Sequence, residues 1–189
     1  DFDFSHLHLW QAHLQGVQLS NVNLAYADLT DSVFSQTFGE VSSIAISPDG
    51  QLLASGAESG EITVWRLSDY QLMTTLTGHG SHVTEVVFSP SGQHLVSSSI
   101  DATIRKWEIA TGQVVWTIEN DQHLVYSVAY SPDGQFIASG GSDSFVSVRD
   151  SNSTKLVCQL ETSRNGATRA VAFHPDGNLL GAASIGGFI

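Results

Sequence analysis

From residue 39 onward, apolar residues mostly alternate with small or polar residues in short runs. A period of two is typical of β-strands with one face more buried than the other, and no helical periodicity accompanies it. The first strand of each repeat is expected at residues 41–46, 83–88, 125–130 and 168–173, and the second at 52–55, 95–97, 136–139 and 179–182. Third strands are expected at 62–65, 104–107 and 146–149, and fourth strands at 71–76, 113–118 and 155–160.

A tight turn follows each first strand, and its proline marks the repeat. The four prolines of the chain are separated by 42, 42 and 43 residues. Proline presets φ for the second position of a turn, and glycine tolerates the positive φ near its end. The motifs are Ser47-Pro48-Asp49-Gly50, Ser89-Pro90-Ser91-Gly92, Ser131-Pro132-Asp133-Gly134 and His174-Pro175-Asp176-Gly177. Four antiparallel strands in each such repeat are typical of a β-propeller blade, so the sequence predicts an all-β fold.

Residues 39–189 resemble the WD-repeat β-propeller family, because the second repeat carries that family's full pattern. The pattern consists of Gly78-His79 before the first strand, Ser97 on the second strand, Asp101 in the next turn and Trp107 on the third strand. The resemblance implies that His79, Ser97, Asp101 and Trp107 form a hydrogen-bonded structural tetrad. A closed chain of this kind satisfies four buried polar side chains together.

The other repeats depart from this pattern and imply only partial tetrads. The first repeat keeps Ser55 and Trp65 but has Ser59 at the aspartate position and no histidine. The third keeps Ser139 and Asp143 but has Asp121 at the histidine position and Arg149 at the tryptophan position, and the fourth has Ala182 and Gly186 in place of Ser and Asp. We hypothesise that Arg149 pairs with Asp143 or Asp121, because a partly buried guanidinium needs a carboxylate.

The first 38 residues follow a period of five, which fits neither a helix nor a flat strand. The apolar positions are Phe4, Leu9, Leu14, Leu19, Leu24, Leu29 and Phe34, and apolar or small residues lie two positions before each. This segment resembles the pentapeptide-repeat family, whose chain winds as a square β-helix with four pentapeptides per coil. The resemblance implies that Leu9 lies beneath Leu29 and Leu14 beneath Phe34. Fewer than two coils are present, so a β-helix end or a cap is expected.

The two patterns divide the chain into residues 1–38, the pentapeptide-type β-helix segment, and residues 39–189, a partial WD-type β-propeller. Blades are expected at 39–78, 79–120 and 121–163, with a truncated fourth at 164–189. Propellers close with about four to eight blades. The remaining blades are therefore expected from C-terminal chain beyond residue 189 or from another chain. This order of repeats resembles that of large bacterial multidomain proteins, which often carry an upstream nucleotide-binding switch domain.

Composition narrows the possible partners. The net charge is −12, with 7 Lys and Arg against 19 Asp and Glu, and this disfavours binding to nucleic acid. The single cysteine, Cys158, excludes an internal disulfide framework. No apolar run reaches the roughly 20 residues of a membrane span, and no signal peptide is visible. We therefore expect a cytoplasmic location, with neither membrane nor nucleic acid as a partner.

Two side-chain groups could suggest chemistry. His79, Ser97 and Asp101 have the residue types of a catalytic triad, but a nucleophile needs a strained, exposed turn and Ser97 lies in an expected strand. His6, His8 and His13 could suggest a metal, but the five-residue frame points His8 and His13 to successive sides of the square. We expect no catalytic residue, no metal and no cofactor.

The function expected from the resemblance is a non-enzymatic protein-interaction scaffold. Partners of such propellers usually bind the loops that enter first strands, here 77–82, 119–123 and 162–166, and the turns at 56–60, 98–102 and 140–144. The expected contact residues are His82, Asn120, Gln122 and Arg164. The alternative is a sensor or autoinhibitory arm of a larger NTPase switch protein.

Overall fold

The computed structural model describes residues 2–3, 22–23, 28, 40–119, 123–162, 166–185 and 187–188. The chain forms two compact units, Asp1–Phe38 (unit 1) and Gly39–Ile189 (unit 2). In the described part of the chain, all regular secondary structure is β-strand, which confirms the all-β prediction.

In unit 1, β1 (Phe2–Asp3) and β2 (Val22–Asn23) pair in parallel. Phe2 lies opposite Val22 and Asp3 opposite Asn23, so residues 20 positions apart are neighbours. Parallel strands need a long connection, and a coil of four pentapeptides supplies one of this length. The expected stacking of Leu9 on Leu29 and of Leu14 on Phe34 lies outside the described residues.

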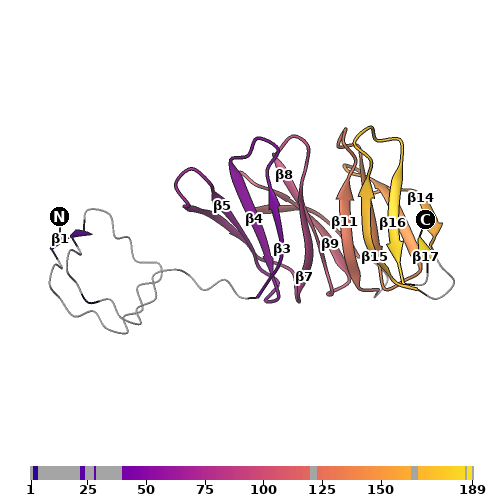
Figure 1. The fold of residues 1–189 in the computed structure, drawn as a ribbon, viewed down its shortest axis with the longest axis horizontal. Coiled ribbons are helices and arrows are strands. Elements are labelled where there is room, and N and C mark those ends of the chain that lie inside the picture. The colour runs from indigo at the N-terminus through magenta and orange to yellow at the C-terminus, as the bar shows by residue number, and fades with distance from the viewer. Residues whose placement is uncertain are drawn as a thin grey trace. The chain divides into compact units, whose positions relative to one another are not determined.

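Unit 2 contains four antiparallel sheets, each built from consecutive strands. The first two are β3 (Val41–Ile46), β4 (Leu52–Ala57), β5 (Ile62–Arg66) and β6 (Leu72–Leu76), then β7 (Val83–Phe88), β8 (His94–Ser99), β9 (Thr103–Glu108) and β10 (Gln113–Glu119). The others are β11 (Val125–Tyr130), β12 (Phe136–Gly141), β13 (Phe145–Asp150) and β14 (Leu156–Glu161), then β15 (Thr168–Phe173), β16 (Leu180–Ser184) and β17 (Gly187–Phe188). Figure 1 shows them following one another across unit 2. Three four-stranded blades and a shorter fourth confirm the predicted partial propeller.

The proline motifs form the turns between the first two strands of each blade. In the first blade, Gly50 has a φ of 71° and its N–H donates to the Ser47 carbonyl oxygen at 2.8 Å. The Ser47 hydroxyl donates to Asp49 Oδ1 at 2.6 Å and accepts from the Leu52 N–H at 2.9 Å. The corresponding glycines Gly92, Gly134 and Gly177 also have positive φ. The repeated prolines therefore mark one turn geometry, which starts each second strand at the same register.

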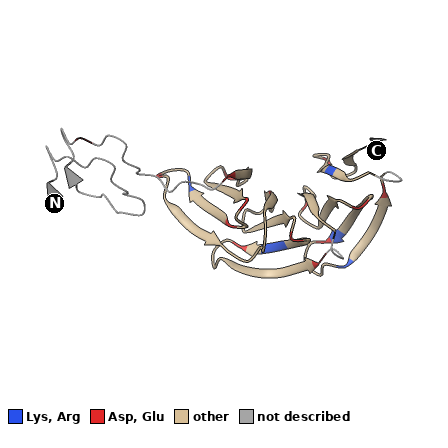
Figure 2. Ribbon diagram, turned by 90° about the horizontal axis from the view of Figure 1, so that it is seen from below, with Lys and Arg blue, Asp and Glu red and all other residues tan. Residues whose placement is uncertain are grey.

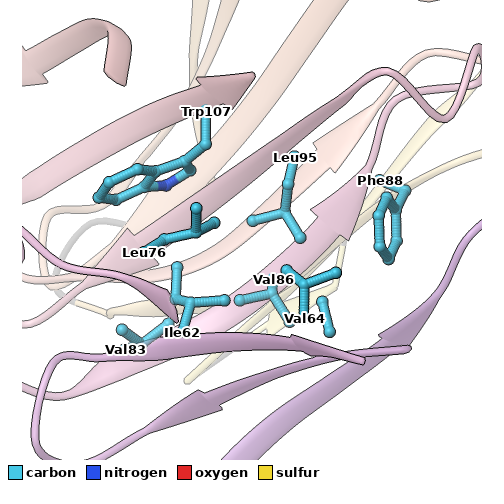
Figure 3. Packing of buried hydrophobic residues seen from close by; sticks show 9 residues of the cluster. Ile62, Val64, Leu76, Val83, Val86, Phe88, Leu95 and Trp107 are labelled. Carbon is cyan, nitrogen blue, oxygen red and sulfur yellow. The ribbon is translucent and has the colours of Figure 1, made fainter. Parts of the chain in front are cut away.

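The core lies between successive sheets. One apolar face of the first blade, with Ile62, Val64 and Leu76, packs against the facing side of the second. Figure 3 shows these side chains together with Val83, Val86, Phe88, Leu95 and Trp107. Equivalent clusters join the second blade to the third and the third to the fourth. The second and third blades thus each use one face for the preceding neighbour and the other face for the next.

Hydrogen bonds between the first strands of neighbouring blades repeat with the same period. Side-chain oxygens of Ser43, Glu85 and Ser127 accept from the backbone N–H groups of Val86, Val128 and Val171, at 3.1, 2.7 and 3.0 Å. Thr84 Oγ1 donates to the Val125 carbonyl oxygen at 2.8 Å, and Ser42 Oγ donates to that of Val83. These bonds join separate sheets and fix the position of each blade along the strand direction relative to the next blade.

The contact between the third and fourth blades predicts an effect of one added methyl group. A Cβ on Gly140 would lie 2.8 Å from Thr168 Cβ and still closer to Thr168 Cγ2. Gly140→Ala should therefore lower the free energy of unfolding by about 1–3 kcal/mol, since overpacking forces backbone or side-chain shifts. Urea denaturation of the chain measures this change. Gly181→Ala is the matched control, because its Cβ would come no closer than 3.8 Å to the Ala172 carbonyl oxygen. Equal losses in the two variants would contradict the expected overpacking.

Candidate functional site

Four side chains of the second blade form one hydrogen-bonded chain. Trp107 Nε1 donates to Ser97 Oγ at 2.8 Å, and Ser97 Oγ lies 2.7 Å from His79 Nε2. His79 Nδ1 lies 2.9 Å from Asp101 Oδ2. The residues come from the β6–β7 loop, from β8, from the β8–β9 turn and from β9. The structure therefore brings together all four residues expected to form the tetrad.

Hydrogen-bond chemistry determines the direction of this chain. The indole N–H of Trp107 can only donate, so Ser97 Oγ accepts from it and is left to donate to His79 Nε2. His79 then carries its proton on Nδ1 and donates to the Asp101 carboxylate. Burial lowers the pKa of His79 from 6.5, against the opposing effect of Asp101. The imidazole is therefore held neutral at neutral pH.

Asp101 ties the β8–β9 turn to the preceding loop. Its Oδ2 accepts from the Gly80 N–H at 2.9 Å, and its Oδ1 accepts from the Thr103 N–H at 2.9 Å and from Thr103 Oγ1 at 2.7 Å. Burial acts to raise the pKa of Asp101, but hydrogen bonds from Thr103, Gly80 and His79 outweigh it and lower the pKa to about 2. Thr103 was not predicted from the sequence, and its signal is a hydroxyl two residues after a turn aspartate.

Burial makes the triad interpretation of these residues untenable. Ser97 is 0% exposed and Trp107 is 1% exposed, while His79 is 8% exposed. A nucleophile must reach a substrate carbon, and Ser97 Oγ is already bound by Trp107 and His79. The arrangement fits a structural role, in which the tetrad holds the loop and the turn at a fixed spacing.

The first blade has a shorter version of the same network. Ser55 Oγ lies 2.7 Å from Thr63 Oγ1, and Trp65 Nε1 donates to Thr63 Oγ1 at 3.1 Å. Thr63 lies opposite Ser55 in the strand register, so its hydroxyl stands between the serine and the indole. Thr63 was not predicted from the sequence.

The third blade tests one of the two partners expected for Arg149. Arg149 lies opposite Ile137, the register position at which Trp107 lies opposite Leu95, and Ser139 lies opposite Ser147. Its Nη1 donates to the Thr154 carbonyl oxygen at 3.3 Å, and among the described residues no ion pair joins it to Asp143. The pairing with Asp143 is therefore wrong, and Arg149 instead donates to a carbonyl oxygen in the turn after β13. Asp121 and Gly186 lie outside the described residues. Ala182 lies opposite Val171, at the serine position.

Only one of the four expected contact residues can be placed. His82 is half-buried, and its Nε2 is buried with no hydrogen-bond partner in the described structure. Asn120, Gln122 and Arg164 lie outside the described residues, as do His6, His8 and His13. Within the described ranges, no three His, Cys, Asp or Glu residues are grouped to hold a metal ion. No helix in those same ranges has the length and apolarity of a membrane span.

Sequential four-stranded sheets that pack face to face, with a buried tetrad in one of them, define a β-propeller repeat protein. Comparison with family models gives the same result. The model described as WD domain, G-beta repeat matches residues 31–66 and 70–108, and the model described as Anaphase-promoting complex subunit 4 WD40 domain matches residues 110–169. The model described as Pentapeptide repeats (8 copies) matches residues 3–36. The chain therefore belongs to the WD-repeat family and carries pentapeptide repeats before its propeller blades.

Similar curated proteins come from bacteria and eukaryotes. The WD repeat-containing protein alr2800 of Nostoc sp. is 43% identical over 82 residues, which are 43% of this chain and 6% of that protein. The WD repeat-containing protein 3 homolog of Dictyostelium discoideum is 38% identical over 36% of this chain and 7% of its own length. The human WD repeat-containing protein 86 is 41% identical over 24% of this chain and 12% of its own length. The chain thus matches a small part of each relative.

The tetrad predicts a specific loss of stability. Ser97→Ala would leave Trp107 Nε1 and His79 Nε2 buried without their partner, which should cost about 1–3 kcal/mol of unfolding free energy. Urea denaturation measures the loss. Ser59→Ala, an exposed turn serine that accepts only a long 3.4 Å bond from the Glu61 N–H, should change stability by less than about 0.5 kcal/mol. If Ser97→Ala were as mild as Ser59→Ala, the tetrad would have no structural role.

The lowered pKa of His79 predicts acid sensitivity. The unfolded chain takes up the His79 proton near pH 6.5, whereas the folded chain takes it up at a lower pH. The unfolded state therefore binds more protons between these two values, and stability falls as pH drops below about 6.5. Urea midpoints between pH 8 and pH 5 should decline more steeply in the wild-type chain than in His79→Gln, whose amide can still donate to Asp101. Identical slopes would show that His79 does not contribute.

Proposed function

We propose that unit 2 is a non-enzymatic scaffold that binds a protein partner through one end of its blades. This loop end comprises residues 40, 58–61, 77–82, 100–102, 119, 142–144 and 161. WD-repeat proteins generally serve as interaction scaffolds, and the family assignment supports the same role here. One observation carries the proposal: the Asp101 carboxylate hydrogen-bonds both to the loop that holds His79 and Gly80 and to Thr103 at the start of β9.

Such attachment makes the loops suitable for binding. A loop that is ordered before its partner arrives loses less conformational entropy on binding. Gly60 of the first blade also approaches this loop, because a Cβ there would lie 2.7 Å from the His79 carbonyl oxygen. The turn of one blade and the loop of the next therefore form one continuous, well-defined surface.

The charge of the loop end indicates the chemistry of the partner. Its exposed acidic residues are Glu40, Glu58, Glu61, Glu119 and Glu161, and half-buried Asp101 and Asp143 lie among them. Figure 2 shows acidic positions recurring along the ribbon of unit 2, while Lys and Arg occupy few separate positions. Complementary charge raises association rates and favours correct orientation. The partner surface should therefore be rich in Lys and Arg.

Charge reversal tests this proposal. Glu58→Lys combined with Glu61→Lys changes the loop end, and Asp69→Lys combined with Asp176→Lys makes the same change of net charge at the opposite end. Both control residues are exposed, and the ion pair of Asp69 with Arg66 is a surface pair of little energetic value. Affinity capture with the full chain, quantified by mass spectrometry, should show a basic partner lost from the loop-end variant and kept by the control.

Two outcomes would overturn the proposal. In one, every captured protein stays bound to the loop-end variant. In the other, both variants lose the partner equally, so that net charge alone controls capture. An autoinhibitory arm of an NTPase switch protein would use the same surface on a domain of its own chain, and no described residue favours that arrangement over a separate partner.

A further inference from the structure

A cleft of about 230 Å³ lies between the second and third blades, at the end of the sheets opposite the loop end. This turn end comprises the proline turns and the β9–β10 and β13–β14 turns. The cleft is lined by the Ser89–Ser91 turn and the Asp133–Gly134 turn, together with His94, Lys106, Tyr130, Ser151 and Asn152. Its volume corresponds to that of about eight waters of liquid, enough for a small organic group.

The repeat itself shows that this cleft is unusual. Lys106 lies opposite Val96 in the strand register, and the matching positions of the first and third blades are Val64 opposite Ala54 and Val148 opposite Ala138. Both valines are buried in the clusters between blades. A cation therefore replaces a buried apolar residue in the seam between the second and third blades.

Two further polar residues replace apolar ones around the same cleft. Tyr130 ends β11, where β7 and β15 end in Phe88 and Phe173. The His94 N–H donates to Ser89 Oγ, as the N–H groups of Leu52 and Phe136 donate to the matching serines of their own turns. His94 thus holds a position that is leucine or phenylalanine in the neighbouring blades. Lys106, Tyr130 and His94 therefore each replace an apolar residue of the repeat, and all three line the same cleft.

Lys106 and Tyr130 bring hydrogen-bond donors to this cleft. Lys106 is 5% exposed, and its Nζ donates to the Ser151 carbonyl oxygen at 3.2 Å and to Asn152 Oδ1 at 3.3 Å. An ammonium has three protons, so one remains without a protein acceptor among the described residues. The hydroxyl of Tyr130 is buried with no hydrogen-bond partner in the described structure. A buried donor without an acceptor is costly, and a ligand oxygen would relieve that cost.

Electrostatics favour an anion with a single charge. Burial lowers the pKa of Lys106 and the Asp150 carboxylate acts against this effect, so a further carboxylate beside Lys106 would favour the charged ammonium. Burial also lowers the pKa of His94, which leaves its imidazole neutral with one N–H to donate. Asp133 at the rim, together with the acidic character of the chain, would repel a doubly charged phosphate more strongly than a carboxylate.

We propose that the cleft between the second and third blades binds a carboxylate, with Lys106 as the ion-pair partner and Tyr130 as a hydrogen-bond donor. The carboxylate comes either from a small free acid or from an acidic side chain of a bound protein segment. Because the cleft lies at the turn end, it is separate from the loop end and independent of the function proposed there.

The chain offers a direct probe, because Lys106 and Lys155 are its two lysines. NMR of the full chain labelled with ¹³C,¹⁵N-lysine therefore reports the cleft and an exposed control in one spectrum. Sodium acetate, titrated against sodium chloride at constant ionic strength, should shift the Lys106 signal to saturation and leave Lys155 unchanged. No shift of Lys106 up to the highest acetate concentration, or equal shifts of both signals, would overturn the proposal.

Two variants follow the repeat and should fold. Tyr130→Phe introduces the residue of the second and fourth blades and should weaken acetate binding by roughly tenfold, the loss expected for a hydrogen bond to a charged group. Lys106→Val introduces the residue of the first and third blades and should abolish binding, followed through tyrosine and backbone signals. Unchanged urea midpoints would confirm that both variants are folded. Acetate affinity equal to wild type in both folded variants would overturn the assignment.

The same titration distinguishes the two sources of the carboxylate. An N-acetylated, C-amidated Gly-Glu-Gly peptide is compared with acetate and with the matching Gly-Gln-Gly peptide. Tighter binding of the Glu peptide than of acetate supports a protein segment, and binding of acetate alone supports a small free acid. Equal binding of the Glu and Gln peptides, or tighter binding of inorganic phosphate than of any carboxylate, would contradict a carboxylate site.

Discussion

The burial of each sheet face against a neighbouring sheet is the constraint on which unit 2 depends. Val83, Val86 and Phe88 of the second blade are 0, 2 and 6% exposed, because the first blade covers them. Val41, Ile44 and Ile46, which lie 42 positions earlier in the first blade, are 43, 65 and 61% exposed. Apolar residues at matching positions are thus core or surface according to whether a neighbouring blade covers them, and stability accumulates across seams between blades.

Hydrogen bonds turn this packing into a defined geometry. The side chains of Ser43, Glu85 and Ser127 hold successive first strands together from separate sheets, and the tetrad of the second blade joins a loop to a turn within one sheet. Apolar contacts alone tolerate small slides, whereas a directional bond to a backbone N–H does not. The fixed loops of the scaffold follow from this combination.

The two ends of the blades carry different chemistry for the same structural reason. Positions within the seams must be apolar unless a polar group finds a partner, because a buried charge is costly to desolvate. Lys106 departs from that rule at the turn end, with two acceptors from the third blade, and Tyr130 departs beside it. At the loop end, Glu58 and Glu61 are exposed, whereas Asp101 is used within the fold by the tetrad.

The sequence by itself determined the architecture, because its signals are local and repeated. The proline turns fixed the repeat, strand alternation placed the four first strands, and His79, Ser97, Asp101 and Trp107 were found in one blade. Only the tertiary structure showed that Thr63 and Thr103 complete the networks, that Arg149 bonds to Thr154, and that Lys106, His94 and Tyr130 line one cleft. These contacts depend on which faces of neighbouring blades meet and at what height, and such distances between separate sheets are not encoded in any local pattern of residues.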